Sequence, residues 1–520
     1  MNIFSWQPSQ KFWTWLLIAW ILLLALAVRS YMFSNTPFEF VDMKQFQSFN
    51  RLFEIRGEIV GDDTRVPIPA NAKVNPAPYP ESPLFVYLVL PFTFLGLEDF
   101  FALSRLATIA YWFLGALALA DILRRQFDLL TSAFGLGLFL LLPYSVMVSR
   151  AFFPEPFMIS FLLLTCWSLM RWRSDMDLLA IGFSATLYTT TIFIKPYALP
   201  ILVGGIAGYA IWRFGLKKAV LSWPILTSFG LGSLLCLIYY TSKPVNSRIA
   251  AEWVIPELAF TSFFYLGWYD QLKATVGFPL VLLGLLGALW FRGKNGFPGM
   301  VWGLLFGYAF YCFTFTRTIA THHYYHAFAV VFAALLAAPV LTSCFRGLYT
   351  LSSPVRAFHK PLLVAFAALL ALHMASEARL EIFHRADGGA RGRDLIAAVE
   401  EVKPVVSDPK RVVFADPYFG YFTRAYTGFT GARFTLNQHS GRFPVRAVER
   451  RLNAVFAQRR ELSVQEHLAQ GEFAYIVCFG EPMIESVLED EAWRTFLDIN
   501  TNLVFSSAEA RVYRLTNTEF

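Results

Sequence analysis

The chain has 520 residues with a mean hydropathy of +0.48, and 56% of its residues are hydrophobic while only 16% are charged. A soluble domain carries about 25% charged residues, so this composition excludes a soluble globular protein and indicates a polytopic membrane protein. The net charge of +7 does not indicate nucleic-acid binding, because the basic residues gather in short loops between apolar stretches. Five cysteines without a spaced Cys/His set support neither a disulfide framework nor a structural zinc site.

The first apolar run, residues 12–33, is long enough to cross a bilayer. Within it, Ala25-Leu26-Ala27 imitates the small-residue site at which signal peptides are cleaved. The apolar part is longer than the ~7 to 15 residues of a signal-peptide core, and Lys11 is the single basic residue before it. We therefore expect an uncleaved membrane anchor.

A long polar loop, about residues 34–103, follows this span and carries Asp42 near its start. The residues after Asp42 have the spacing of an amphipathic helix on the membrane surface: Gln45, Phe49, Leu52 and Phe53. A carboxylate held there is suited to take a proton from an acceptor hydroxyl. The alternative is that Asp42 caps the start of the helix, a role that aspartate commonly fills.

Eleven apolar runs are long enough, or nearly long enough, to cross a membrane. They are residues 12–33, 104–123, 129–148, 151–170, 178–194, 197–214, 219–240, 276–291, 299–315, 323–345 and 361–377. With the N-terminus in the cytoplasm, twelve basic residues fall in the inner loops: Arg124, Arg125, Arg171, Arg173, Arg213, Lys217, Lys218, Arg292, Lys294, Arg346, Arg356 and Lys360. The short outer connections hold mainly Arg150, Lys195 and Arg317, so the bias of basic residues supports this orientation.

Two shorter apolar stretches are left out of this count. Residues 84–97 include Pro91, which suits a helix at the interface better than a crossing. Residues 256–270 end in the Trp268-Tyr269 pair, and such aromatic residues are typical of the headgroup level. Treating either stretch as a span would invert the topology downstream and move several arginine-rich loops outside.

After the last span, residues 378–520 become polar and are long enough for a small domain. Helical periodicity at residues 391–403 and 443–458, and strand patterns at 411–415, 473–479 and 511–515, predict a mixed α/β domain. The fold class expected is therefore an α-helical polytopic membrane domain, residues 1–377, followed by an extracytoplasmic α/β domain, residues 378–520. Asp416-Pro417-Tyr418, after a predicted strand, suits a turn or a ligand contact.

Four groups of ionisable or polar residues lie at the ends of apolar runs on the same predicted side of the membrane. They are Asp42; Arg150 with Glu155; Lys195; and the run His322, His323, Tyr324, Tyr325 and His326. A charge near the centre of a membrane helix costs roughly 2.5 to 3.5 kcal/mol on insertion scales. Their convergence on one face therefore indicates a functional site.

Besides Asp42, two of these groups have a plain structural explanation, and the histidine run has two functional ones. Arg150 and Glu155 flank Pro154 and suit either an ion pair or binding of an anionic ligand. Lys195, in a tight hairpin, suits either an interfacial lysine or a cation near a lipid phosphate. On a helix, His322 and His326 would share one face and permit metal binding, while the histidines and tyrosines together suit donors to phosphate or sugar hydroxyls.

In order and spacing, these features resemble the C-type (GT-C) membrane glycosyltransferases, and more closely the bacterial branch related to protein O-mannosyltransferases and aminoarabinose transferases. The resemblance covers most of residues 12–345. It is carried by Arg29 at the end of the first span, the early Asp42, Tyr79-Pro80-Glu81-Ser82-Pro83-Leu84, Ser149-Arg150-Ala151 with Glu155, Lys195-Pro196 and the His-Tyr-Tyr run.

The resemblance implies transfer of a sugar from a polyprenyl-phosphate carrier, with inversion, on the outer face of the bacterial inner membrane. Asp42 would match the catalytic base, and the substrate-binding candidates are Glu39, Arg150, Glu155, Lys195, His322, His323, Tyr324 and Tyr325. The acceptor is left open among protein, lipid and glycan. The sequence identifies no cofactor and leaves the participation of a divalent metal ion open, since Asp42, Glu155 and the histidines would gather one only if the fold brings them together.

Two positions depart from the family pattern. Met43 stands where many members have a second acid, and Glu39 lies one helical turn earlier as its substitute; Tyr79 stands where many have Lys or His. A function of another class, a multi-pass transporter or lipid flippase, would place charges near the midplane and show repeated halves. The charges here gather at one face and no repeat is visible, so glycosyl transfer is favoured over transport, and over a membrane acyltransferase or polymer ligase.

Overall fold

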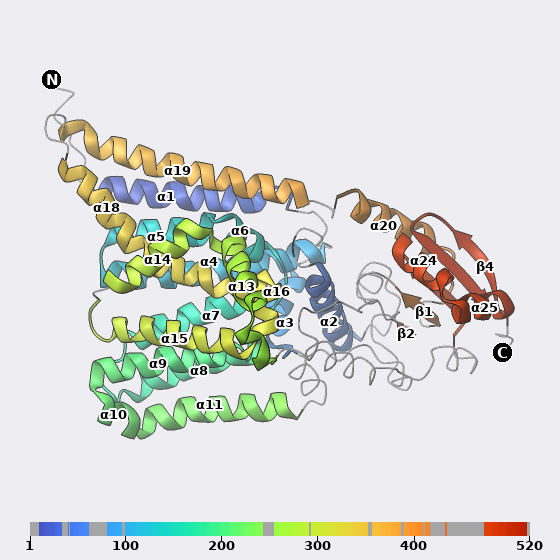
Figure 1. Ribbon diagram of the computed structural model, residues 1–520, viewed down its shortest axis with the longest axis horizontal. Helices are drawn as coiled ribbons and strands as arrows, with labels where there is room; N and C mark the ends of the chain where they lie inside the picture. Colours follow the sequence, from blue (N-terminus) through green and yellow to red (C-terminus); the bar gives the residue numbers. More distant parts are fainter. Residues whose placement is uncertain are drawn as a thin grey trace. The chain divides into compact units, whose positions relative to one another are not determined.

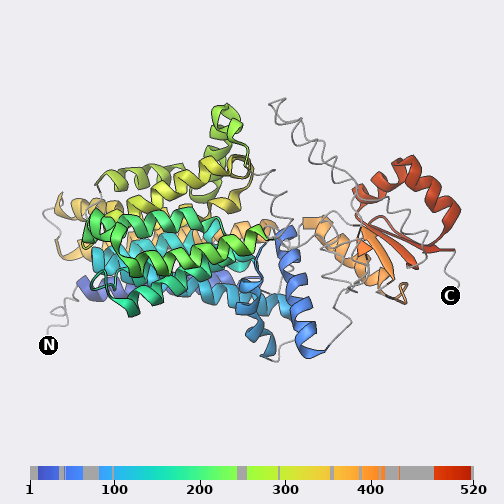
Figure 2. The same ribbon diagram turned by 90° about the horizontal axis from the view of Figure 1, so that it is seen from below.

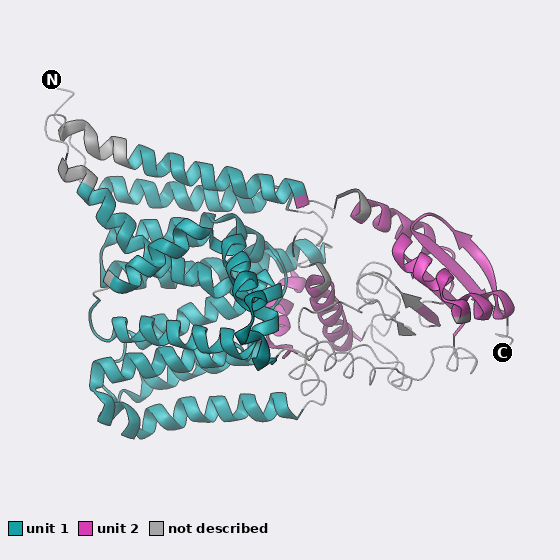
Figure 3. Ribbon diagram, in the orientation of Figure 1, with its two compact units in different colours: residues 1–34, 98–384 teal, residues 35–97, 385–520 magenta. Residues whose placement is uncertain are grey.

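The computed structural model of the chain describes residues 10–33, 40, 42–61, 81–95, 99–242, 254–290, 293–351, 356–385, 389–408, 411–415, 432–433 and 473–516. These residues are mostly helical, with one small sheet near the C-terminus (Figure 1). The chain divides into two compact units, residues 1–34 with 98–384 and residues 35–97 with 385–520 (Figure 3). The boundary predicted after residue 377 falls inside helix α19 (Arg356–Arg385).

The first unit is a bundle of long apolar helices that run side by side (Figures 1 and 2). Its α-helices are α1 (Gln10–Ser30), α4 (Phe100–Gln126), α5 (Leu129–Leu141), α6 (Pro143–Arg150), α7 (Pro154–Leu169), α8 (Leu178–Ile194), α9 (Ala198–Phe214), α10 (Leu216–Leu221), α11 (Trp223–Thr241), α13 (Ser262–Val276), α14 (Phe278–Trp290), α15 (Phe297–Thr314), α16 (Thr316–Thr321), α17 (Ala327–Phe332), α18 (Ala338–Leu351) and α19. A 3₁₀ turn, His323–His326, precedes α17, and a π turn, Ala333–Ala337, joins α17 to α18.

The predicted membrane-spanning architecture is confirmed. Among the described residues, 5 helices are long and apolar enough to cross a membrane, or 7 if each bent helix pair forms one span. Shorter apolar helices, α7, α8 and α9 among them, add to these. Each of the eleven predicted runs lies on one or two helices of the bundle. One of them, residues 129–148, is bent by 61° between α5 and α6, because Pro143 starts the second helix and cannot continue the first.

The two stretches left out of the span count are short or sharply bent. The first forms α3 (Leu84–Val89) and a 3₁₀ turn, Leu90–Phe94, which begins at the residue before Pro91. The second forms a 3₁₀ turn, Pro256–Phe260, and then α13, which continues beyond the predicted end at residue 270. The chain bends by 95° between α13 and α14, at Gly277, whose φ of +79° favours glycine. Neither stretch forms a straight span.

Helices α9 and α15 pack with their backbones almost in contact, and glycines on both helices permit this. A Cβ atom added to Gly208 would lie 2.0 Å from the carbonyl oxygen of Gly299. One added to Gly303 would lie 2.0 Å from the carbonyl oxygen of Gly204. Apolar burial alone does not drive helices together in lipid, so close approach through small residues and the dispersion contacts that it permits stabilise the pair.

We predict that Gly208→Ala destabilises the bundle. The added methyl group overlaps backbone atoms that cannot rotate away, so α9 and α15 must separate, at a cost of about 1–3 kcal/mol. Thermal unfolding of the detergent-solubilised protein measures this as a lower midpoint. Gly230→Ala in α11 is the matched control, because a Cβ there meets nothing within 4 Å. Equal midpoints for the two variants would contradict the proposed contact.

The second unit contains a 5-stranded sheet in the order β2-β1-β3-β5-β4. Its strands are β1 (Val412–Ala415), β2 (Ala432–Arg433), β3 (Tyr475–Phe479), β4 (Thr501–Ser506) and β5 (Ala510–Leu515). β1 pairs in parallel with β2 and β3, whereas β5 pairs antiparallel with β3 and β4. The three predicted strands, β1, β3 and β5, are confirmed, and so is the helix predicted at 391–403, as α20 (Gly389–Val402).

Alternation along the strands places a hydrophobic cluster on each face of this sheet. One cluster joins Val412, Val477 and Val512 to Leu395 and Val399 of α20, and it also includes Phe46 of α2 (Asp42–Val60). The other joins the alternate strand residues to two helices that the sequence did not predict, α24 (Glu481–Glu489) and α25 (Glu491–Asn500). Cys478 lies in this second cluster, where burial raises the pKa of its thiol to about 12, so it is a core residue. The predicted helix 443–458 and Asp416-Pro417-Tyr418 lie outside the described residues.

Candidate functional site

The close approach of α9 and α15 determines where the start of α9 lies. Tyr197, immediately before α9, stacks on Tyr311 of α15 with ring centroids 6.0 Å apart, and it packs against Phe315 at 5.4 Å. Lys195 ends α8, and its backbone N–H donates to the carbonyl of Thr191 at 3.1 Å. The helix–helix contact and the short turn through Pro196 therefore hold Lys195 beside the end of α15.

Glu155 and Lys195 form a buried ion pair. The Nζ atom of Lys195 lies 3.1 Å from Oε1 of Glu155, and the two side chains are 0% and 3% exposed. Glu155 lies in the first turn of α7, and Lys195 follows the last turn of α8. The partial charges at helix ends favour an acid at the first position and a cation at the second. Each charge thus has a helix end as well as its partner to stabilise it.

Tyrosine side chains surround this ion pair. Lys195 Nζ lies 4.9 Å from the ring centroid of Tyr197 and 5.8 Å from that of Tyr325, in cation–π geometry. The rings of Tyr324 and Tyr325 are 4.4 Å apart, and the hydroxyls of Tyr197 and Tyr325 are 3.4 Å apart. The structure therefore brings four predicted site residues together: Glu155, Lys195, Tyr324 and Tyr325.

Two members of the histidine run lie at the rim of this group. His323 is half-buried, and its backbone carbonyl accepts a hydrogen bond from the hydroxyl of Tyr144 at 2.9 Å. His322 is exposed, its Nδ1 atom lies 2.7 Å from the hydroxyl of Thr321, and its ring lies 5.4 Å from that of Tyr324. The ring nitrogens of His322 are the groups of the run placed to meet a ligand first, whereas the Nε2 atom of His323 is buried.

His326 makes two buried hydrogen bonds and does not share a helical face with His322, as the two residues would on one α-helix. It is fully buried; its Nε2 donates to the carbonyl of Ile319 at 2.8 Å, so in the neutral ring Nδ1 accepts from the hydroxyl of Tyr308, also at 2.8 Å. His322 precedes the 3₁₀ turn with extended backbone, at φ −133°. The two histidines therefore do not share a helical face. Among the described residues, no three His, Cys, Asp or Glu side chains group to hold a metal ion.

Arg150 binds the end of α1. Its guanidinium donates to the carbonyls of Arg29 at 2.5 Å, Tyr31 at 2.7 Å and Met32 at 3.0 Å, and the residue is 1% exposed. A cation at the C-terminal end of a helix is stabilised by the unpaired carbonyls there. These contacts support a positioning role for Arg150, and contact with an anionic substrate stays a prediction.

Arg29 and Arg105 extend this arrangement. Arg29 donates to the hydroxyl of Ser149 and to the carbonyl of Leu140, both at 2.8 Å. Arg105 of α4 donates to the carbonyl of Arg150 at 3.2 Å and to that of Phe33. Three arginines thus fasten the end of α1 to α4, α5 and α6. Sequence reasoning noted Arg29 as a family feature and missed Arg105, which lies in an otherwise apolar span.

Asp42 is the first residue of α2, which confirms the predicted helix after it. Behind it in α2, Phe49 and Leu52 are buried, and Lys44 pairs with Glu81 at 3.2 Å. The side chain of Asp42 and all of Glu39 lie outside the described residues. Both belong to the second unit, whereas Glu155 and Lys195 belong to the first. The roles of Asp42 as base and Glu39 as ligand stay predictions.

Sequence reasoning missed two tyrosines at the site, Tyr144 and Tyr197. Tyr197 follows Lys195 by two residues, and its nearness to a predicted site residue was the available signal. Tyr144 lies within the apolar run 129–148 and gave no such signal, because only the bend between α5 and α6 brings it to His323.

No protein-family model matches the chain, and no curated protein matches it. Several solved structures match it. ArnT from Cupriavidus metallidurans bound to undecaprenyl phosphate superposes with a TM-score of 0.58 at 13% identity, covering 98% of this chain and 100% of ArnT. The apo state of ArnT gives a TM-score of 0.60 at 12% identity, covering 97% and 98%.

A second similar structure is the archaeal oligosaccharyltransferase AglB from Archaeoglobus fulgidus in complex with an inhibitory peptide and a dolichol-phosphate. Its TM-score is 0.55 at 12% identity, covering 98% of this chain and 75% of AglB. The chain has the GT-C fold. The resemblance stated from the sequence is therefore confirmed at the level of the fold, over nearly the whole length of this chain and of ArnT.

We predict that Lys195→Met and Glu155→Gln each destabilise this GT-C bundle strongly. Removing one partner leaves the other charge buried without its counter-charge, at a cost of about 3–5 kcal/mol. The double variant loses both charges, so it should be less destabilised than the sum of the two single variants. Thermal unfolding of the wild type and of all three variants measures these losses of stability as a double-mutant cycle.

The control for this cycle is Arg346→Met. Arg346 pairs with Asp128, and their side chains are 54% and 31% exposed. Loss of an exposed pair costs at most about 1 kcal/mol. If Lys195→Met unfolds at the same temperature as Arg346→Met, the Glu155–Lys195 pair is not desolvated as described.

Proposed function

We propose that the chain is an inverting glycosyltransferase that moves a sugar from a polyprenyl-phosphate carrier to an acceptor on the outer face of the bacterial inner membrane. The observation that carries the proposal is the GT-C fold, shared end to end with ArnT, which was solved with undecaprenyl phosphate. AglB was solved with a dolichol-phosphate. A polar, tyrosine-rich site at one end of an apolar bundle suits a donor that has a hydrocarbon chain and a sugar phosphate.

The reaction needs little from the protein besides a base and positive charge. The acceptor oxygen attacks the anomeric carbon, the bond from that carbon to the phosphate oxygen breaks, and the carrier leaves as polyprenyl phosphate with the bonding electrons. The acceptor proton passes to a base, for which we propose Asp42. The phosphate needs no general acid, only donors and cations to stabilise its charge.

The proposed substrate contacts follow from exposure. His322 is exposed, so its ring nitrogens meet an incoming phosphate or sugar hydroxyl before any deeper group; His323 is half-buried and its Nε2 atom is covered, so it would contact the ligand next. Tyr324 and Tyr325 lie behind them, with hydroxyls that donate to the same groups. Lys195 is fully buried against Glu155. We therefore propose that Lys195 orders the tyrosines in the resting protein and approaches the phosphate only if Glu155 releases it.

The acceptor and the sugar are proposed only by class. A peptide is bound in the AglB structure, and protein, lipid and glycan acceptors all present the hydroxyl or amide that such a site would activate. The bias of basic residues in the loops favours an orientation with the Glu155–Lys195 end outside the cytoplasm, where a polyprenyl-linked sugar exposed on the outer leaflet would meet its acceptor.

The donor class is tested with purified protein in detergent. We expect release of free polyprenyl phosphate from a panel of polyprenyl-phosphate sugars, detected by mass spectrometry, and no turnover of the same sugars as nucleotide conjugates. Turnover of a nucleotide sugar alone would contradict the donor class. Movement of the lipid across vesicle membranes without release of sugar would instead support a flippase. A parallel sample with EDTA, then with Mg²⁺ or Mn²⁺ restored, tests for a divalent ion.

The base is tested with Asp42→Asn. An amide cannot accept the acceptor proton, so we expect transfer to fall by roughly 100- to 10,000-fold. Glu58→Gln is the matched control, because Glu58 is an exposed acid on the same helix, α2. It should transfer at the wild-type rate. Equal thermal midpoints would show that both variants fold, and wild-type transfer by Asp42→Asn would remove it as the base.

A further inference from the structure

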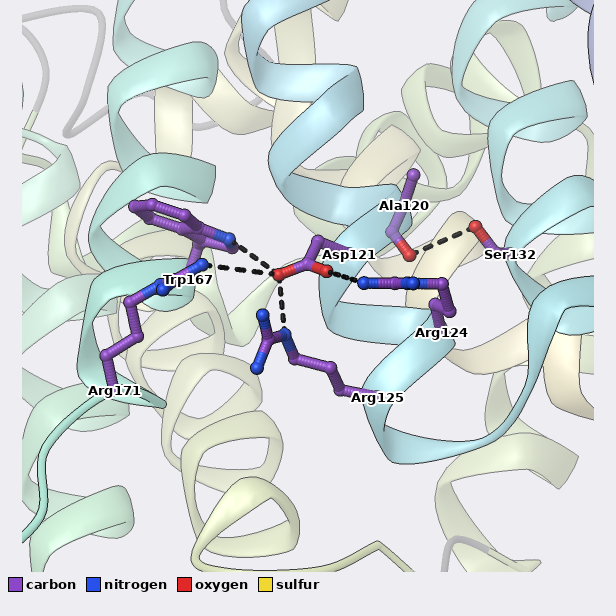
Figure 4. A network of polar contacts seen from close by, with 7 residues as sticks. All are labelled: Ala120, Asp121, Arg124, Arg125, Ser132, Trp167 and Arg171. Atoms are coloured by element: carbon purple, nitrogen blue, oxygen red, sulfur yellow. Dashed lines mark hydrogen bonds and ion pairs between the residues drawn. The ribbon is translucent and has the colours of Figure 1, made fainter.

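Three arginines surround one aspartate where α4 and α7 end, at the opposite end of α7 from Glu155 (Figure 4). Asp121 accepts from Arg124 at 2.9 Å and from Arg125 at 2.6 Å, and Arg171 lies 3.7 Å away. The indole N–H of Trp167 donates to the same carboxylate at 2.9 Å. Three positive charges against one negative charge leave a net charge of +2.

The cluster is held in place rather than loosely solvated. The guanidinium of Arg171 lies 3.9 Å from the ring centroid of Trp167, so stacking fixes its plane. Asp121 binds two arginines of its own helix, α4, and its contacts with Trp167 of α7 and with Arg171 just after α7 join the two helices. A nearby hydrogen bond, from the hydroxyl of Ser132 to the carbonyl of Ala120 at 3.0 Å, ties α5 to the same turn of α4.

The three arginines have further N–H donors besides those that contact Asp121. Their side chains are 54%, 50% and 46% exposed for Arg124, Arg125 and Arg171. A guanidinium has five N–H donors, and the contact to Asp121 uses one nitrogen of each arginine. The remaining donors suit the paired oxygens of a phosphate, which guanidinium groups bind in two-point geometry.

An apolar seam between α4 and α7 leads away from the cluster. On α4, Leu114 and Leu117 lie seven and four residues before Asp121, on the same helical face, and they are 41% and 59% exposed. The facing side of α7 carries half-buried residues at helical spacing: Phe161, Leu164 and Trp167. The rings of Tyr111 and Phe161, 5.9 Å apart, close the far end of the seam.

We infer that this cluster and seam bind one anionic phospholipid, with the phosphate on the arginines and an acyl chain along the leucines. A soluble phosphate would use the arginines but not the exposed apolar seam that continues from them, so the lipid is the better fit. Basic groups between membrane helices on the cytoplasmic side are suited to such headgroups, and the bias of basic residues predicts that this end is cytoplasmic. The site is independent of the proposed transfer reaction.

The inference is tested by native mass spectrometry of the purified full chain with added phosphatidylglycerol or phosphatidylcholine. Wild type should retain phosphatidylglycerol preferentially. The variant Arg124→Gln/Arg171→Gln should bind it at least about tenfold more weakly, because each arginine near a headgroup contributes roughly a fivefold increase in affinity. Lys217→Gln/Lys218→Gln is the matched control; it also removes two exposed basic residues, in α10 on the same predicted side, but lies outside the seam.

Other outcomes would overturn the inference. Equal losses in the two double variants would show attraction to diffuse surface charge instead of a defined site. Displacement of the lipid by glycerol phosphate at similar concentration would show that the seam contributes nothing. Leu117→Gln, which leaves every arginine in place, tests the seam separately. It should weaken the binding of phosphatidylglycerol while leaving the thermal midpoint of unfolding unchanged.

Discussion

The buried ion pair between Glu155 and Lys195 is the interaction on which the candidate site depends. Two charges without access to water are stable only with their partner in place, so α7 and α8 must meet at this one point. The contact is possible because α9 lies against α15 through glycines, which holds the turn after Lys195 at the end of α15. Backbone packing in the middle of the bundle thus determines polar geometry at its end.

The same bundle uses its arginines in two different ways. Arg29, Arg105 and Arg150 are directed at backbone carbonyls around the end of α1 and act inside the protein. The arginines around Asp121 are half-exposed and hold a net positive charge at the opposite end of α7. A guanidinium suits both places, because it stays charged when buried and offers several donors in one plane. Helix α7 therefore connects a neutralised, buried site to an open, cationic one.

The helix that begins at Asp42, α2, belongs to the second unit. Phe46, one turn after Asp42, belongs to the cluster that also contains residues of α20 and of one face of the sheet. The predicted division into a membrane domain and a tail did not foresee that the first loop and the tail form one unit. That association depends on contacts between residues more than three hundred positions apart, which no local pattern records.

The sequence by itself determined the membrane class, the positions of the apolar helices, three strands of the sheet, and the residue types at the Glu155–Lys195 site. Hydropathy, charge bias and strand alternation are local properties, so a single sequence suffices for them. The tertiary structure decided the partners: Lys195 for Glu155, the end of α1 for Arg150, and Ile319 with Tyr308 for His326. The partner of each side chain depends on which helices approach closely. Glycine contacts and helix bends decide that approach, and their effect in three dimensions cannot be read from a single sequence.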